Sequence, residues 1–323
     1  MFKRNLAANV LHSSGLGRMI RNFVPWNGLL VLNYHRVGNN SASRFNQDLW
    51  SATAEDFEAQ VRFFKENADI IGQDDIDEVF SKRSGRFVQF TFDDGYRDNY
   101  EIAFPILKSH GARATFFVVT GFLDDPRVPW WDEIAWMVRG SASPLGGNAA
   151  RDKVVGAVSS VYRTISPGKA NSFLDLLGES MGTGRCTPAD AKDLWMTWDM
   201  AREMQKGGMY FGGHTLTHCE LARLPRAEQF REIKSCKDRI EAELGTPMKT
   251  FSYPYGEEHV FNTDTWSCLQ ELGVKFAYSY YGGYQNAQTW EPLNILRFPM
   301  ERHVTPSLWN FLGTAPRAWR ILD

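Results

Sequence analysis

The chain has 323 residues, with 36 Lys and Arg against 38 Asp and Glu, so its formal net charge is −2 at pH 7. This balance argues against a nucleic-acid binder, which carries a clear basic excess. A hydrophobic content of 43% with 23% charged residues is that of a globular protein and excludes a disordered or fibrous chain.

The first 25 residues are basic, because they contain four Lys and Arg and no acidic residue; the first acidic residue of the chain is Asp48. We expect residues 1–25 to form a basic amphipathic helix that packs across the domain, with adhesion to an anionic membrane face as the alternative. No apolar run approaches the roughly 18 residues of a membrane span, and the run at residues 5–11 is too short for a signal peptide. The four cysteines form no C-x-x-C pair. The sequence therefore favours a cytoplasmic location, peripheral at the inner membrane face if the helix adheres.

Seven short β-type runs follow along the chain, most of them apolar on both faces, as in the strands of a covered parallel sheet. They lie at residues 29–35, 87–92, 113–119, 209–214, 248–253, 274–279 and 294–300. Amphipathic patterns between them predict helices over residues 55–67, 99–110, 226–244 and 261–272. This alternation predicts an α/β fold, either a barrel or a doubly wound sheet.

The stretch between residues 121 and 198 shows no strand pattern. We interpret residues 122–197, approximately, as a helical insertion. Because it falls inside the strand order, it is expected to decorate one domain over residues 26–323 and not to form a second one.

Two adjacent carboxylates, Asp93 and Asp94, follow the second β-type run, and Gly95 allows a tight turn after them. In α/β folds the C-terminal ends of strands face the active site. Adjacent carboxylates can divide the work there, one binding a metal and the other accepting a proton. The alternative is a turn in which an Asp caps the next helix.

Two histidines, His214 and His218, follow the fourth β-type run. If the segment is helical, imidazoles four residues apart lie on one face and suit a divalent metal; a surface pair is the alternative. With one carboxylate they make three ligands and leave room for water, a composition that fits a hydrolytic site of Zn²⁺ or a similar ion. The absence of His-Glu-x-x-His argues against a zincin-type protease.

The order of these motifs resembles a known family. Thr-Phe-Asp-Asp-Gly at residues 91–95, His-Thr-x-x-His at 214–218 and Tyr-Pro-Tyr-Gly at 253–256 are similar to successive motifs of the polysaccharide deacetylases. This is the NodB-homology group, carbohydrate esterase family 4. The likeness covers roughly residues 29–300 and implies an irregular (β/α)₇ barrel, in agreement with the seven runs counted independently.

The resemblance implies that Asp94, His214 and His218 bind the metal, with Zn²⁺ expected and Co²⁺ or another divalent ion as alternatives. Asp93 would be the general base that activates a metal-bound water for attack on an N-acetyl carbonyl. The resulting oxyanion would be held by the metal and by a backbone N–H near Tyr255.

The general acid is a departure from the family pattern, because the usual C-terminal Leu-x-x-His is missing. One branch, resembling the poly-N-acetylglucosamine deacetylases, carries this histidine in an N-terminal Tyr-His motif, which residues 34–35 match. We therefore expect His35 to be the acid. The alternatives are that His303 takes this role or that His35 is a core histidine.

A second departure is the usual Arg-x-Pro-Tyr motif, in which Tyr253 replaces the arginine, and the downstream Asp-x-x-Asp-Trp is missing as well. We expect Arg297, on the last predicted strand, to replace that arginine and to orient Asp93. The alternative is a surface salt bridge.

Aromatic residues make up 14% of the chain and supply the candidate substrate contacts, because apolar sugar faces stack on such rings. The candidates are Trp131, Tyr253, Tyr255 and Tyr281, together with Pro254 of the Tyr-Pro-Tyr-Gly motif. For the tryptophans, core packing is the alternative.

The function that these residues and the resemblance imply is metal-dependent N-deacetylation of N-acetylglucosamine-type saccharides. We expect this reaction to belong to cell-surface or exopolysaccharide biosynthesis. The substrate would be a free or a lipid-linked saccharide. The alternatives are an ester or non-sugar amide hydrolase on the same barrel and a non-catalytic saccharide-binding relative.

Overall fold

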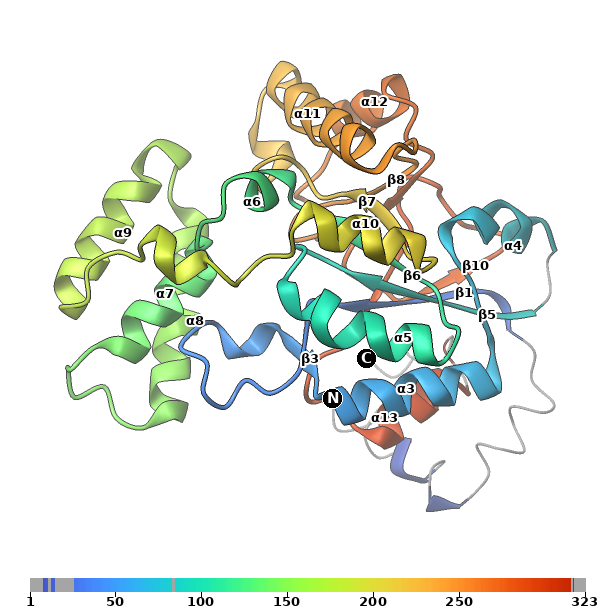
Figure 1. The fold of residues 1–323 in the computed structure, drawn as a ribbon, viewed down its shortest axis with the longest axis horizontal. Coiled ribbons are helices and arrows are strands. Elements are labelled where there is room, and N and C mark those ends of the chain that lie inside the picture. The colour runs from blue at the N-terminus through green and yellow to red at the C-terminus, as the bar shows by residue number, and fades with distance from the viewer. Residues whose placement is uncertain (1–7, 11–12, 15–25, 83–84, 315, 317–323) are drawn as a thin grey trace. The chain divides into compact units, whose positions relative to one another are not determined.

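The computed structural model in Figure 1 describes residues 8–10, 13–14, 26–82, 85–314 and 316. Most of the helix expected over residues 1–25 lies outside these residues. Two compact units make up the chain. The first holds the described residues of Met1–Gly38, Trp50–Asp124 and Met196–Asp323, and the second consists of Asn39–Leu49 and Asp125–Trp195. Among the described helices, none has both the length and the hydropathy to cross a bilayer.

A parallel sheet forms the centre of the first unit. Its strands, in spatial order, are β1 (Asn27–Tyr34), β5 (Gly85–Phe92), β6 (Ala114–Val118), β7 (Tyr210–Gly213), β8 (Thr250–Ser252) and β9 (Phe276–Tyr278). Ile295 bridges to Tyr278 of β9, and β11 (Phe298–Pro299) pairs in parallel with β1. Residues 295–299 therefore join the two edges of the sheet, which curls into the irregular seven-stranded barrel that the sequence predicts.

The remaining strands are short additions to this sheet or lie beside it. They are β2 (Arg36–Val37), which pairs with β3 (Trp50–Ala52), β4 (Asp69–Ile70), which pairs with β5, and β10 (Tyr284–Asn286), which runs antiparallel to β1. None of these was predicted, because runs of two or three residues leave no clear pattern in the sequence.

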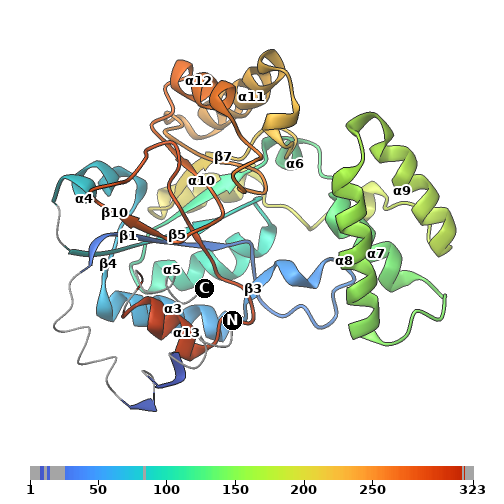
Figure 2. The same ribbon diagram turned by 180° about the vertical axis from the view of Figure 1, so that it is seen from behind.

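Helices pack outside the barrel. They are α3 (Ala54–Asn67), α4 (Ile76–Lys82), α5 (Phe104–Ser109), α6 (Thr120–Asp124), α10 (Trp198–Lys206), α11 (Arg226–Leu244), α12 (Thr263–Glu271) and α13 (Pro306–Leu312). α11 and α12 lie side by side in both views (Figures 1 and 2). The predictions over residues 55–67, 226–244 and 261–272 are confirmed to within two residues, and the one over 99–110 is a π-helical turn, Asn99–Ala103, followed by α5.

The barrel strands alternate between two environments, because successive side chains point to opposite faces. On β1, Leu30 and Leu32 pack in one cluster with the outer helices, whereas Leu29 and Val31 belong to another. Asn33 continues the second face toward the C-terminal end of β1. The interior of the barrel thus changes from apolar to polar along the strands, and this change places the polar site.

The second unit is helical and has a core of its own. It contains α7 (Trp130–Gly140), α8 (Asn148–Thr164) and α9 (Pro167–Met181), whose shared apolar residues include Ile134, Val138, Val155, Leu174 and Leu177. The sequence predicts a helical insertion here but no separate unit. It also assigns residues 39–49 to the barrel, whereas Asn46 N donates to Asp132 Oδ1 at 2.9 Å inside the second unit.

Candidate active site

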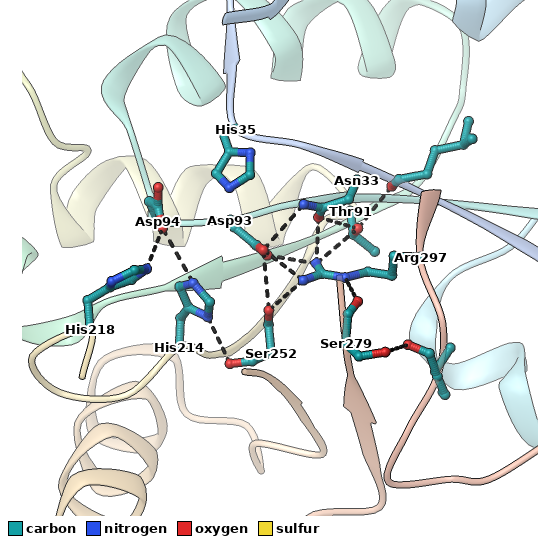
Figure 3. A network of polar contacts seen from close by, with 12 residues as sticks. Asn33, His35, Thr91, Asp93, Asp94, His214, His218, Ser252, Ser279 and Arg297 are labelled. Atoms are coloured by element: carbon teal, nitrogen blue, oxygen red, sulfur yellow. Dashed lines mark hydrogen bonds and ion pairs between the residues drawn. The ribbon is translucent and has the colours of Figure 1, made fainter. Parts of the chain in front are cut away.

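Three buried side chains, Asp94, His214 and His218, converge at the C-terminal ends of β5 and β7 (Figure 3). Asp94 Oδ1 lies 3.4 Å from Nε2 of His214 and 3.3 Å from Nε2 of His218. β5 and β7 flank β6 in the parallel sheet, so their C-terminal ends lie at one edge. The structure therefore brings together the three residues that the sequence selects as metal ligands.

The backbone of this site is unusual. Four described residues other than glycine have a positive φ: Asp94 (77°), Thr215 (65°), His218 (61°) and Tyr255 (66°). All four lie in the motifs that the sequence singles out, and such conformations persist only where surrounding contacts hold them. The helical explanation of the histidine spacing is wrong, since His214 follows β7 directly and residues 215–218 form a turn.

The donor atoms fit a divalent ion. His214 Nδ1 lies 2.8 Å from the backbone oxygen of Ser252, which can only accept a hydrogen bond, so this nitrogen carries the proton. In the neutral form of this ring, Nε2 is therefore the nitrogen that can offer a lone pair to a metal ion beside Asp94. In a tetrahedral Zn²⁺ site with bonds of about 2.0–2.2 Å, ligand atoms lie about 3.3–3.6 Å apart, which matches the two separations from Asp94 Oδ1.

The charges of these groups depend on burial and on one another. Burial alone would raise the pKa of Asp94, but hydrogen bonding to His214 and His218 outweighs it and holds this pKa well below its ordinary value. Burial lowers the pKa of His218, which favours the neutral imidazole that binds metals. Burial acts on His214 in the same direction, but Asp93 and Asp94 raise its pKa overall. The cluster thus combines an ionised carboxylate with imidazoles that a cation can bridge.

Asp93 is held by a buried arginine, as expected from the sequence. Arg297 Nη1 and Nη2 donate to Asp93 Oδ1 and Oδ2, both at 2.8 Å, and Arg297 is 0% exposed. The alternative of a surface salt bridge for Arg297 is therefore wrong. Burial would raise the pKa of Asp93, but the charge of Arg297, followed by that of His214, lowers it overall.

Two further polar residues complete this network, and the sequence reasoning missed both. Asn33 Nδ2 donates to Asp93 Oδ2 at 3.3 Å, and Asn33 Oδ1 accepts from Arg297. Ser252 Oγ accepts from Arg297 Nη2 at 2.8 Å and donates to Asp93 Oδ2 at 3.3 Å, while its backbone oxygen holds His214. The available signal was a polar residue at an inward position of an otherwise apolar strand.

His35 lies at the end of β1, two residues beyond Asn33. Figure 3 shows the His35 ring near Asp93 and Asp94. The positive charge of this ring is one of the causes that lower the pKa of both carboxyl groups. Its backbone is fixed by side chains, because His35 N donates to Ser51 Oγ at 3.0 Å and its oxygen accepts from Asn99 Nδ2 at 2.7 Å.

His303, the alternative acid, lies on the surface. Its side chain is 56% exposed, and its Nδ1 is 3.2 Å from Glu301 Oε2. The structure thus places His35, and not His303, beside the two carboxylates.

Two residues of the Tyr-Pro-Tyr-Gly motif belong to the core. Tyr253 is 1% exposed, donates a hydrogen bond to the Leu293 backbone oxygen at 2.7 Å and stacks on Phe261 with ring centroids 4.0 Å apart. Pro254 is also buried. The prediction that these two residues contact a saccharide is wrong, because their surfaces already pack against the protein.

The other aromatic candidates differ in exposure. Tyr255 is half-buried, with its ring centroid 5.0 Å from that of His218, so it lies at the site. Tyr281 is half-buried, and its hydroxyl accepts from Asn294 Nδ2 at 2.9 Å. Trp131 is 7% exposed in α7 of the second unit, where it meets Trp130 edge to face. Little of the Trp131 ring is therefore available for stacking on a sugar.

Curated relatives match parts of the chain. YxkH of Bacillus subtilis (strain 168), which is assigned to the polysaccharide deacetylases, is 31% identical over 257 residues, or 76% of this chain and 62% of that protein. A poly-beta-1,6-N-acetyl-D-glucosamine N-deacetylase of Staphylococcus aureus (strain MSSA476) is 32% identical over 113 residues. That match covers 31% of this chain and 38% of the relative. The chain thus spans less than two thirds of the length of either relative.

Solved structures share the fold. The Streptococcus pyogenes deacetylase PplD in complex with acetate has a TM-score of 0.60 at 20% identity, covering 89% of this chain and 97% of that one. IcaB from Ammonifex degensii has a TM-score of 0.57 at 18% identity, covering 89% and 96%.

The family model described as polysaccharide deacetylase matches residues 81–277. This range is more than half of the chain and contains Asp93, Asp94 and both histidines of the cluster, but not His35 or Arg297. The chain belongs to the polysaccharide deacetylase family.

Proposed function

We propose that the chain is a hydrolase that removes the N-acetyl group from N-acetylglucosamine-type saccharides, with a divalent metal ion held by Asp94, His214 and His218. The observation that carries this proposal is the convergence of three buried ligand atoms beside a second carboxylate, Asp93, that is held by Arg297. The staphylococcal relative, a poly-beta-1,6-N-acetyl-D-glucosamine N-deacetylase, supports the substrate class.

A divalent ion bound there would supply Lewis acidity, which polarises the acetyl carbonyl and lowers the pKa of a water molecule. Asp93 is the general base in this proposal. Its Oδ1 accepts one hydrogen bond, from Arg297, among the described residues, and a carboxylate oxygen has room for a second. Asp93 can therefore accept the proton of an attacking water while Arg297 and Asn33 keep the carboxylate in place.

His35 is the general acid in this proposal. Water adds to the acetyl carbon, the carbon–nitrogen bond breaks, and acetate and a free sugar amine are the products. The amine nitrogen takes up a proton as it leaves, and His35 is placed to supply it because its ring lies beside both carboxylates. Tyr255, next to His218, is the aromatic residue best placed to contact the sugar.

The test is product release from defined substrates. Purified chain is incubated with N-acetylglucosamine oligomers and with an O-acetylated glycan, each with added Zn²⁺, Co²⁺ or Mn²⁺, and acetate and free amine are measured. We expect equal amounts of acetate and amine from the oligomers and none from Asp93→Asn or Asp94→Ala. Release from the O-acetylated glycan alone would instead favour an esterase, and no release from any N-acetylated substrate would contradict the proposal.

A further inference from the structure

The turn that carries His218 is held by a side chain to which no role has been given. Thr215 and His218 both have a positive φ, 65° and 61°, a conformation that residues other than glycine rarely adopt. The turn has few contacts of its own, chiefly a hydrogen bond from His218 N to Thr215 Oγ1 at 2.8 Å. Contacts from outside the turn must therefore stabilise it.

Glu232 of α11 makes such contacts. Its Oε2 accepts from Leu216 N at 3.1 Å and from Thr217 N at 3.0 Å, and its Oε1 accepts from Thr217 Oγ1 at 3.0 Å. These are three hydrogen bonds to two consecutive residues of the turn. A carboxylate that accepts hydrogen bonds from backbone N–H groups makes strong, charge-assisted bonds. The contacts of Glu232 therefore stabilise the backbone of the turn.

The burial of Glu232 makes this arrangement informative. The residue is 9% exposed, and in the described part of the chain its carboxylate forms no ion pair with a lysine, arginine or histidine. A buried carboxylate costs free energy unless its oxygens are satisfied, and here the turn satisfies them. The Cys219 thiol is another neighbour of this carboxylate. The three hydrogen bonds that Glu232 accepts all come from Leu216 and Thr217.

The backbone oxygen of Leu216 in this turn is also closely fitted. Gly121 N donates to the Leu216 backbone oxygen at 2.9 Å, and a Cβ at position 121 would lie 2.4 Å from that oxygen. The turn thus has a backbone contact at the Leu216 oxygen and the Glu232 carboxylate at the Leu216 and Thr217 N–H groups. Of these, only the carboxylate can be altered without a steric clash.

We propose that Glu232 is a positioning residue that holds the residue 215–218 turn so that His218 can bind the metal ion. This inference rests on the proposed function for the presence of the ion. Glu232 does not touch the ligand atoms; it acts through the backbone that sets the place of the His218 ring. Residues behind metal ligands typically change metal affinity by about 10- to 100-fold when they are lost.

The experiment measures Zn²⁺ affinity by competition with a chromophoric chelator, without substrate, for the full chain and its variants. Glu232→Ala is expected to raise the Zn²⁺ dissociation constant by about 10- to 100-fold, which means weaker binding. Glu232→Gln should lose less, because its amide oxygen can still accept both N–H groups and its NH₂ can donate to Thr217 Oγ1. Glu228→Ala, which removes a carboxylate one turn earlier on α11, is the matched control and should bind as the parent chain does.

Two further measurements keep the outcomes separate. If Glu232→Ala does not fold, Thr217→Val removes one of the three hydrogen bonds and should still weaken binding several-fold. The absorption spectrum of bound Co²⁺ reports the ligand geometry and should change in Glu232→Ala but not in Glu228→Ala. A folded Glu232→Ala, or Thr217→Val in its place, with parental Zn²⁺ affinity overturns the inference. Parent chain that binds Zn²⁺ but releases no acetate contradicts the proposed function alone, and parent chain that binds no Zn²⁺ overturns both.

Discussion

Arg297 and Asp93 lie 204 residues apart in the chain and are joined by two hydrogen bonds of 2.8 Å, one to each carboxylate oxygen. Arg297 belongs to the segment that joins β9 to β1, and Asp93 follows β5. The pair therefore links residues 295–299, the seam at which the barrel closes, to the proposed catalytic base. One contact serves both the fold and the chemistry.

Replacing Arg297 by Met should destabilise the chain strongly. It leaves the Asp93 carboxylate buried without its countercharge, and breaking a buried ion pair in this way costs about 3–5 kcal/mol. Urea unfolding measures the loss. Combining Arg297→Met with Asp93→Asn should restore part of the stability and none of the activity, because the buried charge is then removed as well. Equal stability of the parent and Arg297→Met would contradict this account of the pair.

His35→Ala should lower kcat by about 10²- to 10⁴-fold, the usual contribution of a general acid. The three predicted metal ligands are untouched, so metal content should stay at the parental level. His303→Ala provides the comparison, since His303 is a surface residue beside Glu301. The assignment fails if His303→Ala loses activity while His35→Ala keeps it.

Removing divalent metal with a chelator should abolish turnover, and adding Zn²⁺ or Co²⁺ should restore it. Bound metal should also raise the thermal midpoint, because an ion that binds the folded chain alone at 100 times its dissociation constant adds about 2.7 kcal/mol of stability. Differential scanning calorimetry with and without Zn²⁺ tests this point. Asp94→Ala is the control and should show no such shift, whereas turnover that survives chelation would argue against a metal site.

Tyr253 and Tyr255 should differ in what their loss affects. Tyr253→Phe removes a buried hydrogen bond to Leu293 and should cost about 1 kcal/mol of stability without changing KM. Tyr255→Ala should raise KM for an N-acetylglucosamine oligomer, because this ring lies beside His218. Steady-state kinetics and urea unfolding of both variants provide the check. An increase in KM for Tyr253→Phe would restore its role as a substrate contact.

The sequence was enough to predict the seven barrel strands and the convergence of Asp94, His214 and His218. Strands buried on both faces are continuous apolar runs, and the candidate site residues follow the ends of those runs, as Asp93 and His214 do. Even the seam could be located, although its only regular strand is Phe298–Pro299. These features are local in the sequence, so a pattern reveals them.

The missed features depend on contacts between distant strands. Asn33 meets Thr91 across the β1–β5 pairing and Arg297 across the seam, and no local pattern specifies either register. Tyr253 was misplaced for a related reason. A motif records that a residue type recurs at a position, but whether its ring faces a ligand or Phe261 is decided by packing.

The seam of the barrel also has a consequence for biosynthesis. Ribosomes add about 5–20 residues per second, so roughly 10–40 s separate the synthesis of Asp93 from that of Arg297, 204 residues later. During that interval the Asp93 carboxylate cannot form its ion pair with Arg297. The edges of β1 and β9 also remain unpaired where residues 295–299 bind in the finished barrel. Completion of the barrel therefore requires synthesis as far as residues 295–299, and nascent chains that stop short of residue 297 present open strand edges, which are templates for aggregation.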